Sequence, residues 1–162
     1  MNLATLPAWE LHHAIDSLQA AHVRCIDDDQ LEQWPELFTV DCLYQIIAQE
    51  NAERGLPLAT ILCDSRGMLH DRVVSLRHAN IYEKHQYRHL IGSAVVQSLT
   101  SDSVRVRSNY AVYRTRTNGV SEVFSTGRYD DLMVVVDGVL RFREKTVTFD
   151  TNRIDSLLVT PL

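Results

Sequence analysis

Apolar positions near the start of the chain recur every three or four residues, which is the spacing of one helix face. Between residues 8 and 26 this face consists of Ala8, Leu11, Ile15, Leu18, His22 and Ile26. Pro7 suits the first turn of a helix, where a missing backbone N–H costs nothing. The pattern therefore predicts a helix over residues 8–26, which ends at the three aspartates 27–29.

Two further helices and one strand are expected before residue 80. A second short helix is predicted near Leu31. Its core-facing residues would be Trp34, Leu37 and Phe38. A strand over residues 41–49 and a polar loop follow, and another helix is predicted after Asp64 or Ser65, either of which can cap a helix N-terminus. Its apolar positions would be Leu62, Leu69, Val73 and Leu76.

From about Arg88 onward the hydrophobic period changes to two, which indicates strands with one buried face. The predicted inward positions of the first long strand are Val104, Val106, Ser108, Tyr110 and Val112. Asn118-Gly119 and Asp137-Gly138 offer paired positive-φ positions for tight hairpins, so long strands are also expected over 120–136 and from Leu140 to Asp150. Helices followed by such a meander predict an α+β fold with helices on one face of a strongly curved sheet.

Composition is that of one soluble domain spanning residues 1–162. The chain is 45% hydrophobic and 23% charged, and a domain of this length buries roughly 70% of its unfolded surface. A net charge of −5, with basic and acidic residues interspersed, argues against nucleic-acid binding. Residues 1–13 lack the pattern of an export signal, and no apolar run approaches the about 18 residues of a membrane span. We expect a cytoplasmic protein.

Several kinds of catalytic site are missing from the sequence. Cys25, Cys42 and Cys63 are too far apart for a Cys-x-x-Cys pair and are expected to be reduced, buried thiols. A Rieske cluster needs Cys-x-His and Cys-x-x-His elements, and no cysteine here has a histidine two or three residues after it. There is also no phosphate-binding glycine loop, nucleophile elbow or His-Glu-x-x-His helix.

Histidines and arginines leave other chemistries open. On a helix, His85 and His89 would share one face as metal ligands, although their polar and aromatic neighbours favour a structural or contact role. Asp71 with His70 or His78 could transfer protons in a pocket, or could belong to a salt-bridged helix face. The long strands contain seven arginines, of which several would project from one face of neighbouring strands, and this favours a partner protein. The seven are Arg105, Arg107, Arg114, Arg116, Arg128, Arg141 and Arg143.

Motifs along nearly the whole chain resemble the small subunits of aromatic-ring-hydroxylating oxygenases. They are the segments 32–38, 41–44, 55–58, 64–92, 122–124 and 155–158. Within segment 64–92, Met68-Leu69-His70-Asp71-Arg72, Ala79-Asn80-Ile81-Tyr82-Glu83 and Tyr87-Arg88-His89 are most similar to the branch acting on carboxylated aromatics such as terephthalate, salicylate, benzoate or anthranilate.

The resemblance implies a cone-shaped α+β fold similar to nuclear transport factor two and scytalone dehydratase, with the N-terminal helices packed in a mostly antiparallel sheet. It implies a structural role with no catalytic, cofactor-binding or metal-binding residue in this chain. The Rieske iron-sulfur cluster and the mononuclear iron would belong to a large alpha subunit. Three large and three small chains would assemble, with the small chains as a trimer. The implied contact residues are Arg72, Arg77, Tyr82, Tyr87, Arg88 and His89.

Two other functions remain open at this point. One is a stand-alone dehydratase or isomerase of the same cone-shaped superfamily, in which Asp71 and a pocket histidine would lie within hydrogen-bond reach. The other is a small-ligand binding module, which needs a sizeable apolar pocket with a few polar groups at its mouth.

Overall fold

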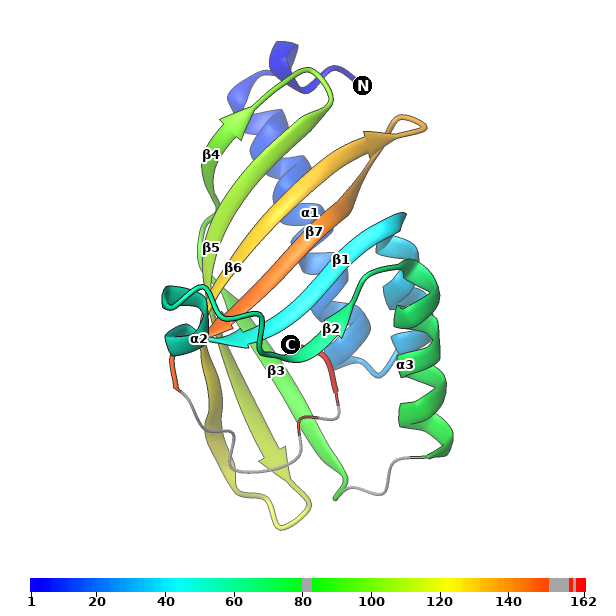
Figure 1. Ribbon diagram of the computed structural model, residues 1–162, viewed down its shortest axis with the longest axis vertical. Coiled ribbons are helices and arrows are strands. Elements are labelled where there is room, and N and C mark those ends of the chain that lie inside the picture. The colour runs from blue at the N-terminus through cyan, green and yellow to red at the C-terminus, as the bar shows by residue number, and fades with distance from the viewer. Residues whose placement is uncertain (80–82, 152–157, 159) are drawn as a thin grey trace.

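The computed structural model describes residues 1–79, 83–151, 158 and 160–162. In the described residues, the two longest helices lie on the concave side and at one flank of a single curved sheet (Figure 1). The helical segments, of which η1 and η2 are 3-10 helices, are η1 (Leu3–Thr5), α1 (Ala8–Asp27), η2 (Leu31–Leu37), α2 (Gln49–Glu53) and α3 (Arg66–His78).

Seven strands form that sheet in the described part of the chain. They are β1 (Phe38–Ala48), β2 (Ala59–Cys63), β3 (His85–Ile91), β4 (Val95–Leu99), β5 (Ser103–Arg116), β6 (Ser121–Val136) and β7 (Val139–Phe149). The strand order is β2-β1-β7-β6-β5-β3, and β4 also pairs with β5. Only the β1–β7 pairing among the described strands is parallel, so the sheet is mostly antiparallel, as predicted.

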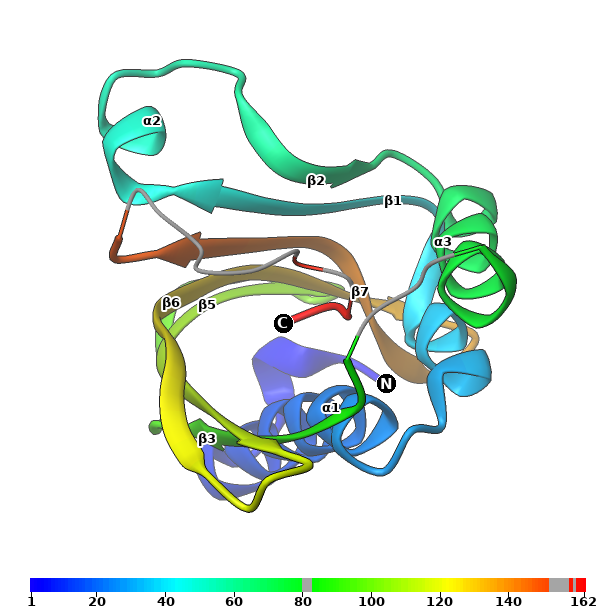
Figure 2. The same cartoon turned by 90° about the horizontal axis from the view of Figure 1, so that it is seen from below.

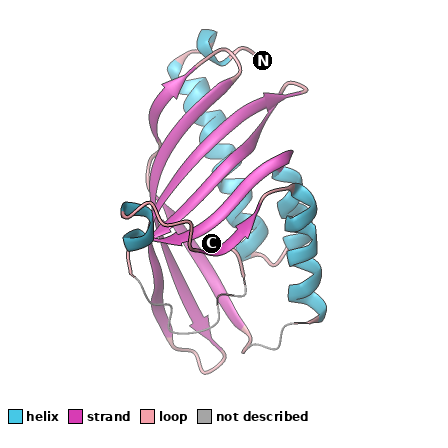
Figure 3. Ribbon diagram, viewed as in Figure 1, coloured by secondary structure: helices cyan, strands magenta, loops and turns pink. Residues whose placement is uncertain are grey.

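The sheet curls around α1 to form a cone, which Figure 2 shows from its open end. Figure 3 shows α3 standing at the flank beside β1 and β2. The inward face of α1 is formed by Leu11, Ile15, Leu18, His22, Cys25 and Ile26. The predicted helix and its apolar face are thus confirmed except for Ala8, which is exposed. The cone-shaped α+β fold is confirmed as well.

Curvature comes from irregularities in the long strands. The register shifts by a residue between Val112 and Tyr113 on β5 and between Leu132 and Met133 on β6, and such bulges bend a strand and increase its twist. Gly127 on β6 lies directly against the backbone of β7, opposite Phe149. A Cβ at this position would stand 2.0 Å from the main-chain oxygen of Thr148. Only glycine allows β6 and β7 to approach this closely.

The two predicted hairpins differ in their turn geometry. Asp137 and Gly138 have φ of 51° and 79°, so the paired positive-φ turn between β6 and β7 is confirmed. At the other hairpin only Gly119 has a positive φ, of 84°, and the prediction for Asn118 was wrong. The N–H of Gly119 donates to the main-chain oxygen of Arg116, and the N–H of Arg116 donates to the main-chain oxygen of Val120. The connection between these two residues therefore contains three residues, and one left-handed residue is enough for such a loop.

The middle of the chain contains strands that the periodicity did not predict. Leu62 was assigned to the helix that follows, but it lies on β2 and its side chain points outward, 52% exposed. That helix begins at Arg66, after Ser65, whose side chain accepts from the N–H of Met68. Strand β4 was not predicted. His85 and His89 lie on β3, so the condition under which they would share a helix face is not met.

The three cysteines are buried free thiols, as expected. Burial raises the pKa of the Cys42 thiol to about 11, which keeps it protonated. Among the described helices, none is long and apolar enough to cross a membrane.

We predict that Gly127→Ala lowers the free energy of unfolding by about 3 kcal/mol or more, because the new methyl group would overlap the β7 backbone. Urea denaturation followed by circular dichroism measures this. Gly67→Ala is the matched control: the nearest atom to its Cβ is 3.9 Å away, and stability should stay the same or rise by up to about 1 kcal/mol. Equal stability of the two variants would contradict the proposed role of Gly127.

Candidate functional site

The centre of the cone contains a fully buried ion pair. Lys145 on β7 and Asp131 on β6 are both 0% exposed, and the Lys145 Nζ lies 3.1 Å from each Asp131 carboxylate oxygen. Gln19 on α1 donates to Asp131 at 3.3 Å and to the Ser108 hydroxyl at 3.0 Å. The pair therefore fastens α1 to two strands of the sheet. Burial raises the pKa of Asp131 and lowers that of Lys145, and each charge opposes the shift of the other.

Aromatic rings enclose this pair. The Lys145 Nζ lies 3.7 Å from the centroid of the Tyr129 ring and 4.7 Å from that of Phe142, so the ammonium group contacts two ring faces. Tyr110 stacks on Tyr129 with ring centroids 4.5 Å apart. The hydroxyl of Tyr129 is buried and has no hydrogen-bond partner among the described residues.

A second buried group surrounds His22 on α1. The indole N–H of Trp34 donates to His22 Nδ1 at 3.1 Å. The other ring nitrogen, Nε2, therefore carries the proton and faces the main-chain oxygen of Leu162 at 3.3 Å. Burial, with help from the charges of Lys145 and His89, holds the pKa of His22 well below its ordinary value. His22 is thus a neutral, fixed hydrogen-bond donor.

Asp27 and His89 form a third pair, which joins the end of α1 to β3. Asp27 accepts from the Nδ1 of His89 at 2.6 Å and from its main-chain N–H at 2.9 Å. The His89 side chain is 0% exposed, and its Nε2 has no partner in the described part of the chain. A carboxylate that orients an imidazole in this way is the usual arrangement of a general base, although solvent does not reach this nitrogen.

The predicted contact residues fall into two groups. Tyr87 and His89 point into the cone, and the Tyr87 ring stacks on Phe124 at 5.2 Å. Arg88, between them, points outward with its side chain 58% exposed, and donates to the Asp27 main-chain oxygen at 3.0 Å. The structure thus brings these three residues together around the end of α1.

The other contact candidates belong to α3 and its C-terminal connection. Arg72 donates to the main-chain oxygen of Leu158 at 3.1 Å. Arg77 binds Asp29 at 2.6 Å and Glu32 at 2.8 Å, which ties α3 to the turn between α1 and η2. Tyr82 lies outside the described residues.

The arginines of the long strands mostly meet carboxylates of the same chain. On the outer face of the sheet, Arg107 and Arg128 both reach Asp130, at 2.7 and 3.3 Å. Arg105 similarly binds Glu144, and Arg143 binds Asp41. The prediction that several arginines share one face of adjacent strands is confirmed for these four, whereas Arg114 lies on the opposite face of β5, buried against the Phe124 ring. Because these guanidinium groups already have partners, they are weaker evidence for a partner protein than the sequence suggested.

The groups considered for proton transfer on α3 are separate from the cone interior. His70 binds Glu36 at 3.1 Å on the surface, and Asp71 and His78 are exposed. His85 and His89 have different partners, because His85 Nδ1 lies 2.8 Å from the main-chain oxygen of Glu83. Within the residues that the structure describes, no three His, Cys, Asp or Glu side chains gather as metal ligands would.

Comparison with known proteins gives the family. The family model for the ring hydroxylating beta subunit matches residues 21–156. The chain belongs to this family. The small subunit of anthranilate 1,2-dioxygenase from Burkholderia cepacia is 46% identical over 145 residues, which are 90% of each chain. Beta subunit 2 of the terephthalate 1,2-dioxygenase terminal oxygenase from Comamonas sp. is 38% identical over 148 residues, covering 91% of this chain and 96% of that one.

Solved structures agree with the family. A beta subunit assigned to an aromatic-ring-hydroxylating dioxygenase from Novosphingobium aromaticivorans has a TM-score of 0.88 and 47% identity, with 96% of this chain and 99% of that chain covered. The benzoate 1,2-dioxygenase beta subunit from Burkholderia mallei, at 17% identity, has a TM-score of 0.73 over 91% of this chain and 95% of that one, and shares the fold. The ring-hydroxylating beta subunit reading of the sequence is confirmed.

Sequence reasoning missed most of the buried polar residues of this beta subunit. Asp131 and Lys145 look like ordinary surface charges in an alternating strand, and Gln19 lies beside the predicted apolar face of α1. Alternation along β6 could have revealed that Asp131 is buried, because it lies two residues from each of the buried Tyr129 and Met133 and so faces the same side of the sheet. His22 was placed correctly on the apolar face, but its partners come from distant segments.

We predict that Lys145→Met lowers the free energy of unfolding by about 3–5 kcal/mol, because Asp131 would remain as a buried, unpaired charge. Chemical denaturation measures the loss. The double variant Lys145→Met with Asp131→Leu is the control, since removing both charges should restore much of the stability. A double variant that is no more stable than the single one would contradict this account.

The unfolding free energy should also depend on pH through His22. A histidine with a lowered folded pKa contributes its full stability above the ordinary value of 6.5. That contribution is lost as pH falls below 6.5 toward the folded pKa, because the unfolded chain takes up the proton first. The slope from one such group is up to about 1.4 kcal/mol per pH unit.

Urea denaturation at a series of pH values between 7 and 5 measures this slope. It should be smaller in His22→Gln than in the unsubstituted chain. Trp34→Phe removes the hydrogen bond to the imidazole and keeps the titrating group, so this variant should be less stable but retain the slope. An unchanged slope in His22→Gln would contradict the assignment.

Proposed function

We propose that this beta subunit is the structural small subunit of the terminal oxygenase in a cytoplasmic, multicomponent Rieske non-heme iron dioxygenase. A large alpha subunit performs the catalysis and holds the Rieske cluster and the mononuclear iron. Three large and three small chains form the complex, with the small chains as a trimer. The observation that carries the proposal is the match to oxygenase small subunits along nearly the whole chain.

The side chains of this subunit support the assignment of the Rieske cluster to the large subunit. A Rieske cluster is bound by two thiolates and two imidazoles. Cys25, Cys42 and Cys63 are buried, and burial raises the pKa of each thiol, which disfavours the thiolate form that a cluster requires. The donor groups of this chain therefore do not fit the cluster.

An aromatic carboxylate is the substrate class that we propose for the complex. The names of the two relatives described above refer to anthranilate and to terephthalate, and both compounds are aromatic carboxylates. The choice of ring and the position of oxygen insertion belong to the large subunit in this proposal.

For the contact with the large subunit, we propose the predicted set of Arg72, Arg77, Tyr82, Tyr87, Arg88 and His89. Among the described members Arg88 has the most exposed side chain, and Tyr87 and His89 support the strand beneath it. Arginine is enriched at protein interfaces, where it combines apolar contact with several hydrogen bonds.

The stand-alone dehydratase or isomerase is the second candidate, and one observation favours it. The Asp27–His89 pair has the hydrogen bond that such an enzyme needs, although with residues other than Asp71. The lone chain would then convert a small substrate without a partner, and Asp27→Asn would abolish this activity.

We expect this chain to co-elute with its large subunit as a stable hetero-oligomer when both are co-expressed, because the small subunit is an integral part of the assembly. Size-exclusion chromatography with light scattering gives the mass, and iron analysis of the complex and the lone chain locates the metal. Iron should be found in the complex and not in the lone small chain. Stoichiometric iron in the lone chain, or a lone chain that dehydrates a small substrate, would overturn the structural role.

The same experiment tests the contact surface through Arg88→Ala, which should weaken the association at least about tenfold. Arg54→Ala is the matched control: this arginine directly follows α2, its side chain is 66% exposed, and it forms an ion pair with Glu50. Equal association of the two variants would remove Arg88 from the interface while leaving the complex itself in place.

A further inference from the structure

The last described residues of the chain enter the open end of the cone. Figure 2 shows this segment between the curled sheet and α1. Leu158 and Leu162 belong to the hydrophobic core, and Leu162 is only 1% exposed. Leu162 thus lies beside side chains of α1, β1 and β6.

Two buried side chains hold Leu162 by its main chain. The Tyr44 hydroxyl donates to the Leu162 oxygen at 3.0 Å and accepts from the Leu162 N–H at 3.0 Å. His22 Nε2 faces the same oxygen at 3.3 Å. Tyr44 and His22 are both 0% exposed. Two fixed donors converging on one oxygen are the arrangement that a binding site uses to orient the carbonyl or carboxylate of a ligand.

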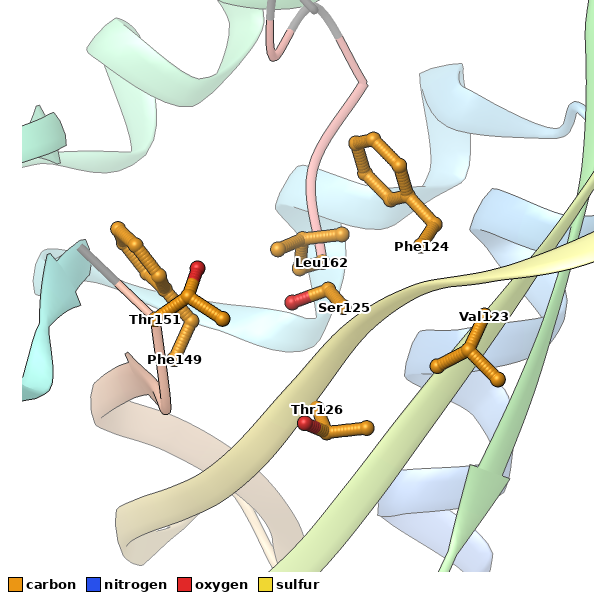
Figure 4. Close-up of a pocket in the computed structure, with 7 residues that line it drawn as sticks. All are labelled: Val123, Phe124, Ser125, Thr126, Phe149, Thr151 and Leu162. Atoms are coloured by element: carbon orange, nitrogen blue, oxygen red, sulfur yellow. The ribbon is translucent and has the colours of Figure 1, made fainter. Parts of the chain in front are cut away.

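A cavity of about 130 Å³ adjoins this oxygen site. Figure 4 shows that Leu162 borders it together with residues of β6 and β7. Its lining comprises Val123, Phe124, Ser125, Thr126, Phe149, Thr151 and Leu162. An apolar cavity of about 150 Å³ is large enough to bind benzene. Removal of the Leu162 side chain would therefore leave room for a ring-sized apolar group.

An independent observation also points to a polar occupant in the same region. The Tyr129 hydroxyl is fully buried and has no partner among the described residues, and its ring centroid is 6.3 Å from that of His22. A buried hydroxyl that is left unbonded costs free energy, so the cone interior retains hydrogen-bonding capacity that its own described side chains do not use.

We propose that the cone interior is a binding site for a small molecule with an apolar body and one carbonyl or carboxylate oxygen, and that Leu162 fills this site in cis. His22 and Tyr44 bind the oxygen, and the apolar body takes the place of Leu162 and the adjoining cavity. The covalently attached segment has a high effective concentration and outcompetes free ligand. Binding becomes measurable when the segment is removed. This inference is independent of the large subunit.

Benzoate binding to a chain lacking residues 158–162 tests the proposal. Trp34 reports on the site because its indole bonds to His22, and Trp9→Phe removes the signal of the exposed second tryptophan. The shortened chain should bind benzoate at least about tenfold more tightly than the full chain. Tyr44→Phe in the shortened chain should weaken binding about tenfold, since one donor to the ligand oxygen is lost. Equal benzoate affinity of the shortened and full chains, or no effect of Tyr44→Phe, would overturn the proposal.

Circular dichroism establishes whether the shortened chain is folded. If the shortened chain is unfolded, Leu162→Ala in the full chain is the test, because this substitution enlarges the cavity and leaves the main-chain contacts of residue 162 in place. Benzene should then raise the melting temperature of Leu162→Ala and not that of the unsubstituted chain. Leu58→Ala is the control, since Leu58 is 60% exposed and borders no part of this cavity. No response of Leu162→Ala to benzene would overturn the proposal.

Discussion

Desolvation of charge at the centre of the cone is the constraint on which the rest of the structure depends. A carboxylate and an ammonium group without water are tolerated only when they face each other and their remaining hydrogen-bonding sites are occupied. Asp131 and Lys145 meet this condition through Gln19 of α1 and the ring faces of Tyr129 and Phe142. Helix and sheet must therefore adopt one relative position.

Buried polar groups at the open end of the cone also need hydrogen-bond partners, although these groups are neutral. His22 receives a hydrogen bond from Trp34 and gives one to the main chain of Leu162, and Tyr44 completes the arrangement. Three segments far apart in sequence thus meet through directional bonds. These bonds fix the position of Leu162 inside the cone.

Much of the fold could be predicted from the sequence, because α1 and β5 to β7 have strong and regular periods. The short elements could not, since β2 and β4 contain only five residues each, which are too few to establish a period, and β4 also exposes most of its side chains. Leu62 was misassigned for this reason. Asn118 was misread because dipeptide composition does not reveal whether a loop has two or three residues. The buried pairs were missed because Asp27, Asp131 and Lys145 bind partners that lie more than a dozen residues away in the sequence.

The parallel pairing of β1 with β7 has a consequence for how the molecule folds. These strands are separated by roughly a hundred residues, so their contact requires closure of a very long loop, which is entropically costly and slow. The β5–β6 and β6–β7 pairings are local, so we expect this meander to form before β1 joins it. Until then β7 presents an open edge, with the apolar lining of the cone accessible. The unpaired N–H and C=O groups of such an edge can pair with strands of other chains. Rapid docking of β1 therefore protects the newly made subunit from aggregation.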